Sequence, residues 1–282
     1  MPTPPNNLRD FKSFVEIVQA LRGPEGCPWD KEQTHKTLTR YAIEETYELV
    51  EAIESGSISD MRDELGDVLL QVVLHSEISR QNGEFDINDV IESIGSKMVR
   101  RHPHVFARGT ADGAAKTPDE VIKKWDEIKA EEKAQKKSKS ESTDSSTNEA
   151  HNPFSNLPKA LPALQRSQKI GGKTVRFNFD WSQPSEVLAK LDEEIAELKE
   201  AIESKSLHEQ NKELGDVLFT VAQLARHLNL DAEQALREGN SKFETRFLKM
   251  RQLVEAEKKD FGSLSTGELE VYWQKAKKLE RM

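Results

Sequence analysis

Two stretches of similar sequence decide the fold: EETYELVEAIES at residues 44–55 and EEIAELKEAIES at residues 193–204. A second motif, ELGDVL, occurs at residues 64–69 and again at residues 213–218, at the same distance behind the first motif in each case. Because both the order and the spacing are kept, the chain contains an internal duplication. Each copy is expected to fold as the same structural unit.

The apolar residues around these motifs recur every three or four positions, as they do on one face of an α-helix. In the first copy they form two runs: Ile43, Tyr47, Val50 and Ile53, then Leu65, Val68, Leu69, Val72 and Val73. Between the runs lies SGSISD, where Gly56 suits a helix C-terminus and Ser59 or Asp60 suits the next N-cap. The pattern predicts a helical hairpin. Further helices are expected at 87–100 and 119–132, so the predicted fold class is all-α, with two tandem helical-bundle domains.

A polar stretch separates the two copies. Residues 133–152 read KAQKKSKSESTDSSTNEAHN and contain no apolar side chain larger than that of alanine. Such a segment cannot bury enough surface to fold by itself. We therefore expect an N-terminal helical domain at 1–132, a flexible linker at 133–152 and a C-terminal helical domain at 153–282.

Composition narrows the class of protein. The chain has 282 residues, enough for about two domains, and 32% of them are charged. The net charge of −9 argues against nucleic acid as a partner, because binding to backbone phosphates needs a basic face. There is no apolar run of membrane-spanning length, residues 1–7 show no apolar leader, and Cys27 is the single cysteine. We expect a cytoplasmic protein that does not enter membranes.

Carboxylates are placed regularly along the predicted hairpin. Glu45 and Glu48 are three residues apart, so they share one face of the first helix. Glu64 and Asp67 share a face of the second helix in the same way. In antiparallel helices joined by a short turn, residues equally far from the turn lie at one level, which sets the first pair opposite the second. The second copy repeats the arrangement with Glu194, Glu197, Glu213 and Asp216.

Four carboxylates at close quarters repel one another unless a cation neutralises them. Their oxygen atoms suit Mg²⁺ or Mn²⁺, and Mg²⁺ commonly combines one or two carboxylates with substrate phosphates. The alternative is a solvated helix surface, which usually carries Lys four residues from Glu. Residues 44–54 contain five Glu and no Lys or Arg, which favours a metal site. The charge argument is weaker in the second copy, where Lys190, Lys199 and Lys205 lie nearby.

Two other chemistries fit the sequence less well. A carboxylate-bridged di-iron bundle needs Glu-x-x-His on two helices, and the one such spacing, Glu32 to His35, lies in a predicted loop before the carboxylate helix. A phosphate-binding GxxxxGK[ST] loop is absent from the sequence. The stretch GGKT at residues 171–174 lacks the first glycine of that motif and is expected to be a loop.

The paired EExxE and ExxD motifs occur together with GCPWD, RRHPHVF, ALPALQRSQKI, FDW, LARHL and SKFETRF. In this combination the chain resembles, over nearly its whole length, the MazG-type nucleoside triphosphate pyrophosphohydrolases. The resemblance implies an all-α enzyme that assembles as a homodimer through its helical bundles and requires Mg²⁺, with Mn²⁺ as a substitute. It also implies hydrolysis of a broad range of ribo- and deoxynucleoside triphosphates to monophosphate and pyrophosphate.

The resemblance further implies roles for individual residues. In the C-terminal half the metal ligands would be Glu194, Glu197, Glu213 and Asp216, and the nucleotide would face Lys190, Lys242, Arg246 and Trp273. We complete the catalytic set with Glu193, which neighbours Glu194 and is a candidate to orient the attacking water. In the N-terminal half the metal ligands would be Glu45, Glu48, Glu64 and Asp67, with Lys97 and Arg101 toward the substrate. The C-terminal half would be the main catalytic unit. Thr245 stands where a second arginine is expected, which weakens the predicted hold on phosphate.

The residues leave three functions open. The favoured one is a broad pyrophosphohydrolase with a role in nucleotide house-cleaning or stress response, in which water attacks the α-phosphorus and expels pyrophosphate. An enzyme narrow for dUTP, dCTP or a damaged nucleotide would use the same carboxylates. A non-catalytic helical protein, whose acidic clusters dock a basic partner, would bind without magnesium-dependent turnover.

Overall fold

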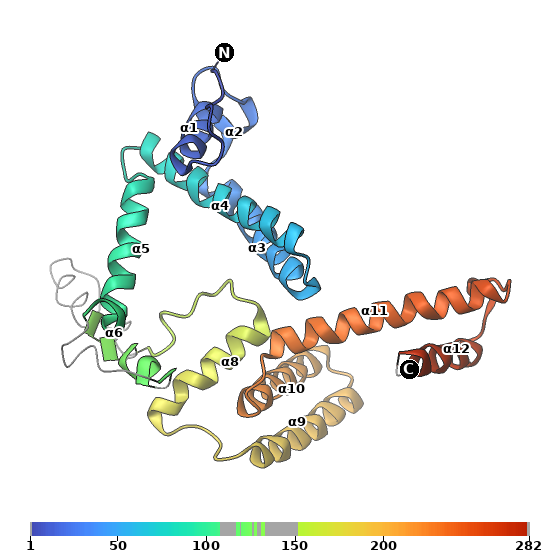
Figure 1. Cartoon of the computed structure of the whole chain (residues 1–282). Helices are drawn as coiled ribbons and strands as arrows, with labels where there is room; N and C mark the ends of the chain where they lie inside the picture. Colours follow the sequence, from blue (N-terminus) through green and yellow to red (C-terminus); the bar gives the residue numbers. More distant parts are fainter. Residues whose placement is uncertain are drawn as a thin grey trace. The chain divides into compact units, whose positions relative to one another are not determined.

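The computed structural model describes residues 2–107, 117–118, 120–125, 127–128, 131–132 and 152–280 (Figure 1). All regular secondary structure in these ranges is helical, which confirms the predicted all-α class. The chain divides into two compact units, unit 1 (Met1–Asp144) and unit 2 (Ser145–Met282). The predicted linker at 133–152 lies outside the described residues except for Asn152, so the predicted domain boundaries stay a prediction.

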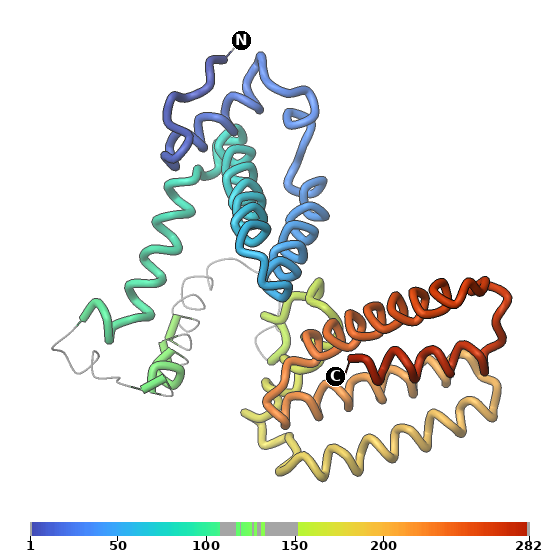
Figure 2. Tube along the Cα trace, turned by 45° about the vertical axis from the view of Figure 1, so that its right-hand side comes forward, coloured from blue at the N-terminus to red at the C-terminus, as the bar shows by residue number. Residues whose placement is uncertain are grey.

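Unit 1 is built around an antiparallel hairpin of two long helices, α3 (His35–Ser55) and α4 (Ile58–Gln81), which run side by side in Figures 1 and 2. The hairpin is preceded by α1 (Phe11–Arg22), which packs on α4, and by the short α2 (Pro28–Glu32). It is followed by α5 (Ile87–Arg101) and α6 (Pro103–Phe106). The predicted hairpin and the predicted helix at 87–100 are therefore both present.

The core of unit 1 lies where α1 meets the hairpin, and it is formed by Val18, Leu38, Val73, Leu74 and Ile78. Beside it, the Nδ1 atoms of His35 and His75 lie 2.7 Å apart, and His35 Nε2 lies 3.2 Å from Ser79 Oγ. Burial, followed by the charge of His35, lowers the pKa of His75. These contacts fix the start of α3 against α4. His35 was predicted to lie in a loop, but it is the first residue of α3, because Thr34 caps the helix.

The turn between α3 and α4 is tighter than the sequence suggested. Gly56 takes the left-handed conformation, with φ 74°, as predicted for a residue that ends a helix. The N-cap of α4 is Ser57, whose side chain accepts a hydrogen bond from the Asp60 backbone N–H, so the expectation of Ser59 or Asp60 was wrong. Ser57 directly follows Gly56, so only these two residues separate the end of α3 from the start of α4. Unit 2 uses the same turn, with Lys205 in the left-handed position.

Unit 2 repeats the hairpin with α9 (Pro184–Ser204) and α10 (Leu207–His227). It is preceded by α8 (Ala163–Thr174) and the 3₁₀ turn η3 (Val175–Phe177), and α8 packs on α10. The long α11 (Ala232–Ala256), the turn η4 (Phe261–Ser263) and α12 (Thr266–Leu279) follow. α12 folds back along α11, as both views show. The core between them is formed by Met250, Val254, Tyr272 and Ala276.

Both hairpins leave the same apolar positions uncovered. In unit 1 these are Ile53, Ile58, Leu65, Leu69 and Val72, and in unit 2 they are the matching Ile202, Leu207, Leu214, Leu218 and Val221. Each of these side chains is between 40% and 81% exposed. We call the two sets the apolar hairpin faces. The helical spacing of the apolar residues was thus predicted correctly, but much of the stripe is not core. Single exposed apolar residues are ordinary, whereas a matched set on two hairpins indicates a surface that is covered in use.

The stretch GGKT was expected to be a loop, but residues 171–174 form the last turn of α8. Gly171 is buried and faces Gln223, which is fully buried on α10. Gln223 Nε2 donates to the Ser167 carbonyl at 2.7 Å, and its Oε1 accepts from Arg226 Nε at 2.8 Å. A Cβ atom at position 171 would lie 1.8 Å from Gln223 Oε1. Glycine is therefore needed here for the close approach of α8 to α10, which the sequence pattern did not reveal.

We predict that Gly171→Ala destabilises unit 2 by about 1–3 kcal/mol, because the added methyl group must displace a buried, hydrogen-bonded amide. The measurement is the free energy of unfolding in urea. Gly172→Ala is the matched control, since nothing lies within 4 Å of its Cβ position, and it should gain about 0.5–1 kcal/mol from better helix propensity. Equal behaviour of the two variants would contradict the packing described here.

Candidate functional site

In unit 1 the hairpin brings three of the four predicted carboxylates together. One carboxylate oxygen from each of Glu45, Glu48 and Glu64 lies within 4.8 Å of the others. Asp67 is outside this set, but among the charges that raise the pKa of Glu45 its carboxylate is the largest. The predicted antiparallel register places Glu45 at the same level as Asp67. The strong effect of the Asp67 charge on Glu45 agrees with that register.

Unit 2 assembles an equivalent cluster from a different three of its four residues. Oxygen atoms of Glu194, Glu213 and Asp216 lie within 4.8 Å of one another. Glu197 is outside the set and exposed. Its pKa is raised by partial desolvation of the carboxylate and then by the charge of Glu194, while Lys190 acts in the opposite direction. All four carboxylates of unit 2 therefore lie close enough to contribute to one electrostatic site.

Each cluster contains a buried carboxylate oxygen, which is unusual for an acidic group. Glu194 and Glu213 are each only 7% exposed. The Oε2 atom of Glu213 is buried without a hydrogen-bond partner, and so is Oε2 of Glu64, its counterpart in unit 1. A buried charged oxygen without a partner is costly, and a divalent cation with oxygen preference would satisfy it. The residues present therefore fit a metal such as Mg²⁺.

The carboxylates of unit 1 repel one another, and no basic side chain among the described residues pairs with them. Burial raises the pKa of Glu45, followed by the charges of Asp67, Glu48 and Glu64. Burial also raises the pKa of Glu64, followed by the charges of Glu48 and Asp67 and a hydrogen bond with Glu48. In the described part of the chain, no Lys or Arg forms an ion pair with these four groups.

Unit 2 differs because two lysines reach its carboxylates. Lys190 Nζ lies 2.8 Å from Glu193 Oε1 and 2.9 Å from Glu194 Oε1. Lys212 Nζ lies 2.9 Å from Glu213 Oε1. These bonds raise the pKa of both lysines. Glu193 itself is 57% exposed in its side chain, so it lies at the rim of the cluster.

The predicted phosphate-binding arginines are held by glutamates that the sequence analysis did not single out. Arg246 Nη2 donates to Glu280 at 2.6 Å, and its guanidinium lies 5.1 Å from the ring centroid of Trp273. In unit 1, Arg101 Nη2 donates to Glu132 at 2.5 Å. Arginine holds the pKa of Glu132 at about 2. Glu132 and Glu280 follow Trp125 and Trp273 at the same spacing, a signal that could have found them.

The remaining basic residues make no such bonds. Lys242 is exposed and Lys97 is half-buried. Within the described residues, neither these lysines nor Arg101 and Arg246 form a hydrogen bond or ion pair with the carboxylate clusters. Of the predicted basic residues, Lys190 bonds a carboxylate of its cluster, and the other four make no such bond within the described ranges.

The FDW motif anchors the segment before α9. Asp180 accepts hydrogen bonds from Arg226 at 3.0 and 2.5 Å and contacts His227 Nε2 at 3.1 Å. These partners, Arg226 first, lower the pKa of Asp180 despite its burial. Trp181 meets His227 edge to face. The motif therefore fixes the start of the carboxylate helix α9 against the end of α10.

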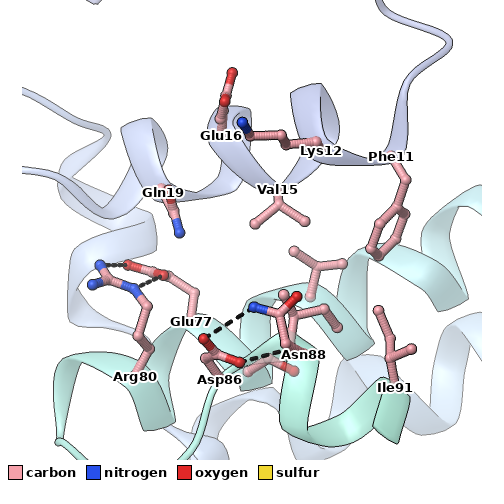
Figure 3. Close-up of a pocket in the computed structure, with 13 residues that line it drawn as sticks. Phe11, Lys12, Val15, Glu16, Gln19, Glu77, Arg80, Asp86, Asn88 and Ile91 are labelled. Carbon is pink, nitrogen blue, oxygen red and sulfur yellow. Dashed lines mark hydrogen bonds and ion pairs between the residues drawn. The ribbon is translucent and has the colours of Figure 1, made fainter.

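A cavity of about 390 Å³ lies elsewhere in unit 1, between α1, α4 and α5 (Figure 3). Phe11, Val15 and Ile91 line its apolar part, and the Glu77–Arg80 pair lies on its polar side. None of the clustered carboxylates lines it. It is therefore separate from the metal site suggested by the hairpin.

Comparison with known proteins gives concordant matches. The family model described as the MazG nucleotide pyrophosphohydrolase domain matches twice, at residues 33–106 and 182–249. A relative from Thermotoga maritima, named nucleoside triphosphate pyrophosphohydrolase/pyrophosphatase MazG, is 43% identical over 95% of both chains. A nucleoside triphosphate pyrophosphohydrolase of Escherichia coli K12 is 40% identical over 97% of this chain and 99% of its own. Both matched segments contain a complete set of four carboxylates.

A test of the repulsion in unit 1 is Glu64→Gln in the absence of divalent metal. Because the folded state raises the pKa of Glu64, the ionised group lowers stability above its unfolded pKa of about 4.3. The variant should therefore melt a few degrees higher at pH 8 in EDTA, and the gain should shrink toward pH 4. Glu51→Gln, at an exposed position on the facing helix α3, serves as the control. A lower melting temperature for Glu64→Gln would rule out net repulsion.

Proposed function

The chain belongs to the MazG nucleotide pyrophosphohydrolase family, and on this premise we propose that it hydrolyses a broad range of ribo- and deoxynucleoside triphosphates with Mg²⁺. The enzyme class, nucleoside triphosphate pyrophosphohydrolase, follows from the two full-length relatives. The observation that carries the metal requirement is the buried, unpartnered carboxylate oxygen inside an acidic cluster, present in both units. The proposed role is removal of surplus or damaged nucleotides in the cytoplasm.

The proposed metal ligands are Glu194, Glu197, Glu213 and Asp216 in unit 2 and Glu45, Glu48, Glu64 and Asp67 in unit 1. Mn²⁺ has the same preference for oxygen ligands and is expected to substitute. When bound, Mg²⁺ supplies Lewis-acid activation of the phosphate and neutralises its charge. We assign the main activity to residues 153–282, because in that half two lysines already adjoin the carboxylates.

The other site residues act on water and on the triphosphate. Glu193, at the exposed rim of the cluster, orients the water that attacks the α-phosphorus and holds its proton. Lys242 and Arg246 offset the charge of the departing pyrophosphate, with Glu280 orienting Arg246. Trp273, below that guanidinium, offers a face on which many bases can stack. Lys97 and Arg101 take the corresponding places in unit 1.

The first prediction of this assignment concerns the products. With Mg²⁺, each common nucleoside triphosphate should yield monophosphate and pyrophosphate, and EDTA should abolish turnover. Glu213→Ala should lower kcat/KM by more than about 100-fold, since outer-shell partners of a metal alone cost 10–100-fold. Product analysis by ion-exchange chromatography measures this.

The outcomes separate the proposal from its rivals. Turnover confined to dUTP, dCTP or a damaged nucleotide would identify a narrow enzyme. Release of diphosphate and orthophosphate, or binding of a basic protein without any turnover, would overturn the proposed reaction. Glu64→Ala, measured in parallel, reports how much unit 1 contributes.

We further propose that the chain forms a homodimer through its apolar hairpin faces. The support is the matched exposure of these residues on both hairpins, since obligate interfaces resemble a domain core cut in half. A second copy of the chain offers the same face, as a symmetric interface requires. The proposal concerns the faces themselves and does not depend on the metal.

Leu214→Glu combined with Leu218→Glu should convert the dimer to a monomer of 32.0 kDa, because buried charges would lack partners. Sedimentation equilibrium gives the mass. Leu8→Glu is the control, because Leu8 is 71% exposed but lies outside the hairpin. A wild-type chain that sediments as a monomer at micromolar concentration would refute the proposed interface.

A further inference from the structure

The two carboxylate clusters differ in one respect that the shared motifs hide. In unit 2, Glu194 and Glu213 each have one oxygen bound by an ammonium group. Lys190 also bonds Glu193, so its Nζ bridges two carboxylates. Its side chain is 34% exposed, whereas that of Lys212 is 61% exposed. Lys190 therefore makes more contacts than Lys212 and is the less exposed of the two.

Unit 1 has neither lysine. Counting from the shared motifs, Tyr41 stands where unit 2 has Lys190, and Asp63 stands where it has Lys212. Tyr41 packs against the core of unit 1, and Asp63 pairs with Arg62 at 2.9 Å. Among the described residues, the unit 1 cluster thus has acidic neighbours and no ammonium partner, although its hairpin carries the same four carboxylates.

A lysine and a divalent cation compete for the same oxygen atoms. The Oε1 atoms of Glu194 and Glu213 already accept hydrogen bonds from ammonium groups. Two cations in contact with one carboxylate cluster repel each other, so a metal that binds there weakens the lysine bonds. The long lysine side chains can turn away without unfolding the helix, and the nearest new anion in the active complex is the triphosphate.

Resting on the proposed function, we propose that Lys190 and Lys212 are exchangeable counter-ions. They hold the place of the metal in the free site of unit 2 and move onto the substrate phosphates when metal and nucleotide bind. The site of unit 1, which has neither lysine, binds divalent metal more tightly in the absence of nucleotide. The site of unit 2 is thereby filled by metal and nucleotide together, whereas the site of unit 1 binds metal before nucleotide.

The competing explanation is that Lys190 merely stabilises a helix surface, since it lies four residues from Glu194. The two explanations predict opposite effects on metal affinity. If the lysines only support the fold, their removal leaves metal binding unchanged or weaker. If they occupy the place of the cation, their removal strengthens it.

The test measures Mn²⁺ binding to the full-length chain in the absence of nucleotide. Titration calorimetry gives the affinity, and electron paramagnetic resonance measures the concentration of free Mn²⁺. Glu64→Gln weakens the unit 1 site so that unit 2 is observed alone, and Glu213→Gln does the reverse. In the Glu64→Gln background, Lys190→Met and Lys212→Met should each tighten Mn²⁺ binding by about two- to fivefold, the range expected for a partly exposed ion pair. The same substitutions should raise KM for the nucleotide. Lys199→Met, at an exposed position on α9, is the matched control.

A second variant adds a lysine to unit 1 instead of removing one from unit 2, so its result does not depend on the unit 2 site. Asp63→Lys in the Glu213→Gln background introduces the missing counter-ion at an exposed position and should weaken Mn²⁺ binding to unit 1. Unchanged or weaker binding in the lysine variants, or unchanged binding in Asp63→Lys, would overturn the exchange. Failure of Mn²⁺ to bind any Glu213-dependent site, together with no pyrophosphate release, would instead overturn the proposed function itself.

Discussion

Repulsion between carboxylates held on facing helices is the constraint on which the functional part of this molecule depends. Each hairpin fixes acidic groups at one level, and each buries an oxygen that has no protein partner. The rest of the fold keeps that arrangement in place against the repulsion. In unit 1 the His35–His75 contact ties the helices at one end of the hairpin, and in unit 2 the Asp180–Arg226 pair holds the segment before α9 against the end of α10. The fold therefore maintains a local electrostatic cost that a divalent cation can remove.

Much of this could be predicted from the sequence, because helix periodicity and motif spacing are local properties. The hairpin, the left-handed Gly56 and the convergence of carboxylates all follow from residue spacing. The need for glycine at position 171 does not, because it arises from the approach of α8 to Gln223 on a distant helix. The partners of Arg101 and Arg246 were missed for a similar reason, since Glu132 and Glu280 lie more than 30 positions along the chain. The exposure of the apolar hairpin faces also could not be predicted, because a helix shows the same apolar spacing whether its apolar face is buried or exposed.

The duplication has preserved the chemistry more closely than its surroundings. The hairpins and their acidic groups match residue by residue, yet α8 contacts both α10 and α11, while a cavity separates α1 from α5 in unit 1. Lysines adjoin the carboxylates in unit 2 and are replaced by Tyr41 and Asp63 in unit 1. Two sites with the same ligands can thus differ in the charge that they present to a substrate. That difference arises from residues outside the shared motifs.

The histidine contact also makes part of unit 1 sensitive to acid. A single proton can lie between two Nδ1 atoms, so the bond between His35 and His75 requires at least one neutral ring. The lowered pKa of His75 means that the folded state favours its neutral form. The resulting stability is present above the unfolded pKa of about 6.5 and decreases as the pH falls below it. Mild acidification would therefore weaken the His35–His75 contact at the end of the unit 1 hairpin that lies away from its turn. The corresponding end in unit 2 is held by Arg226, which keeps its charge, and would be unaffected.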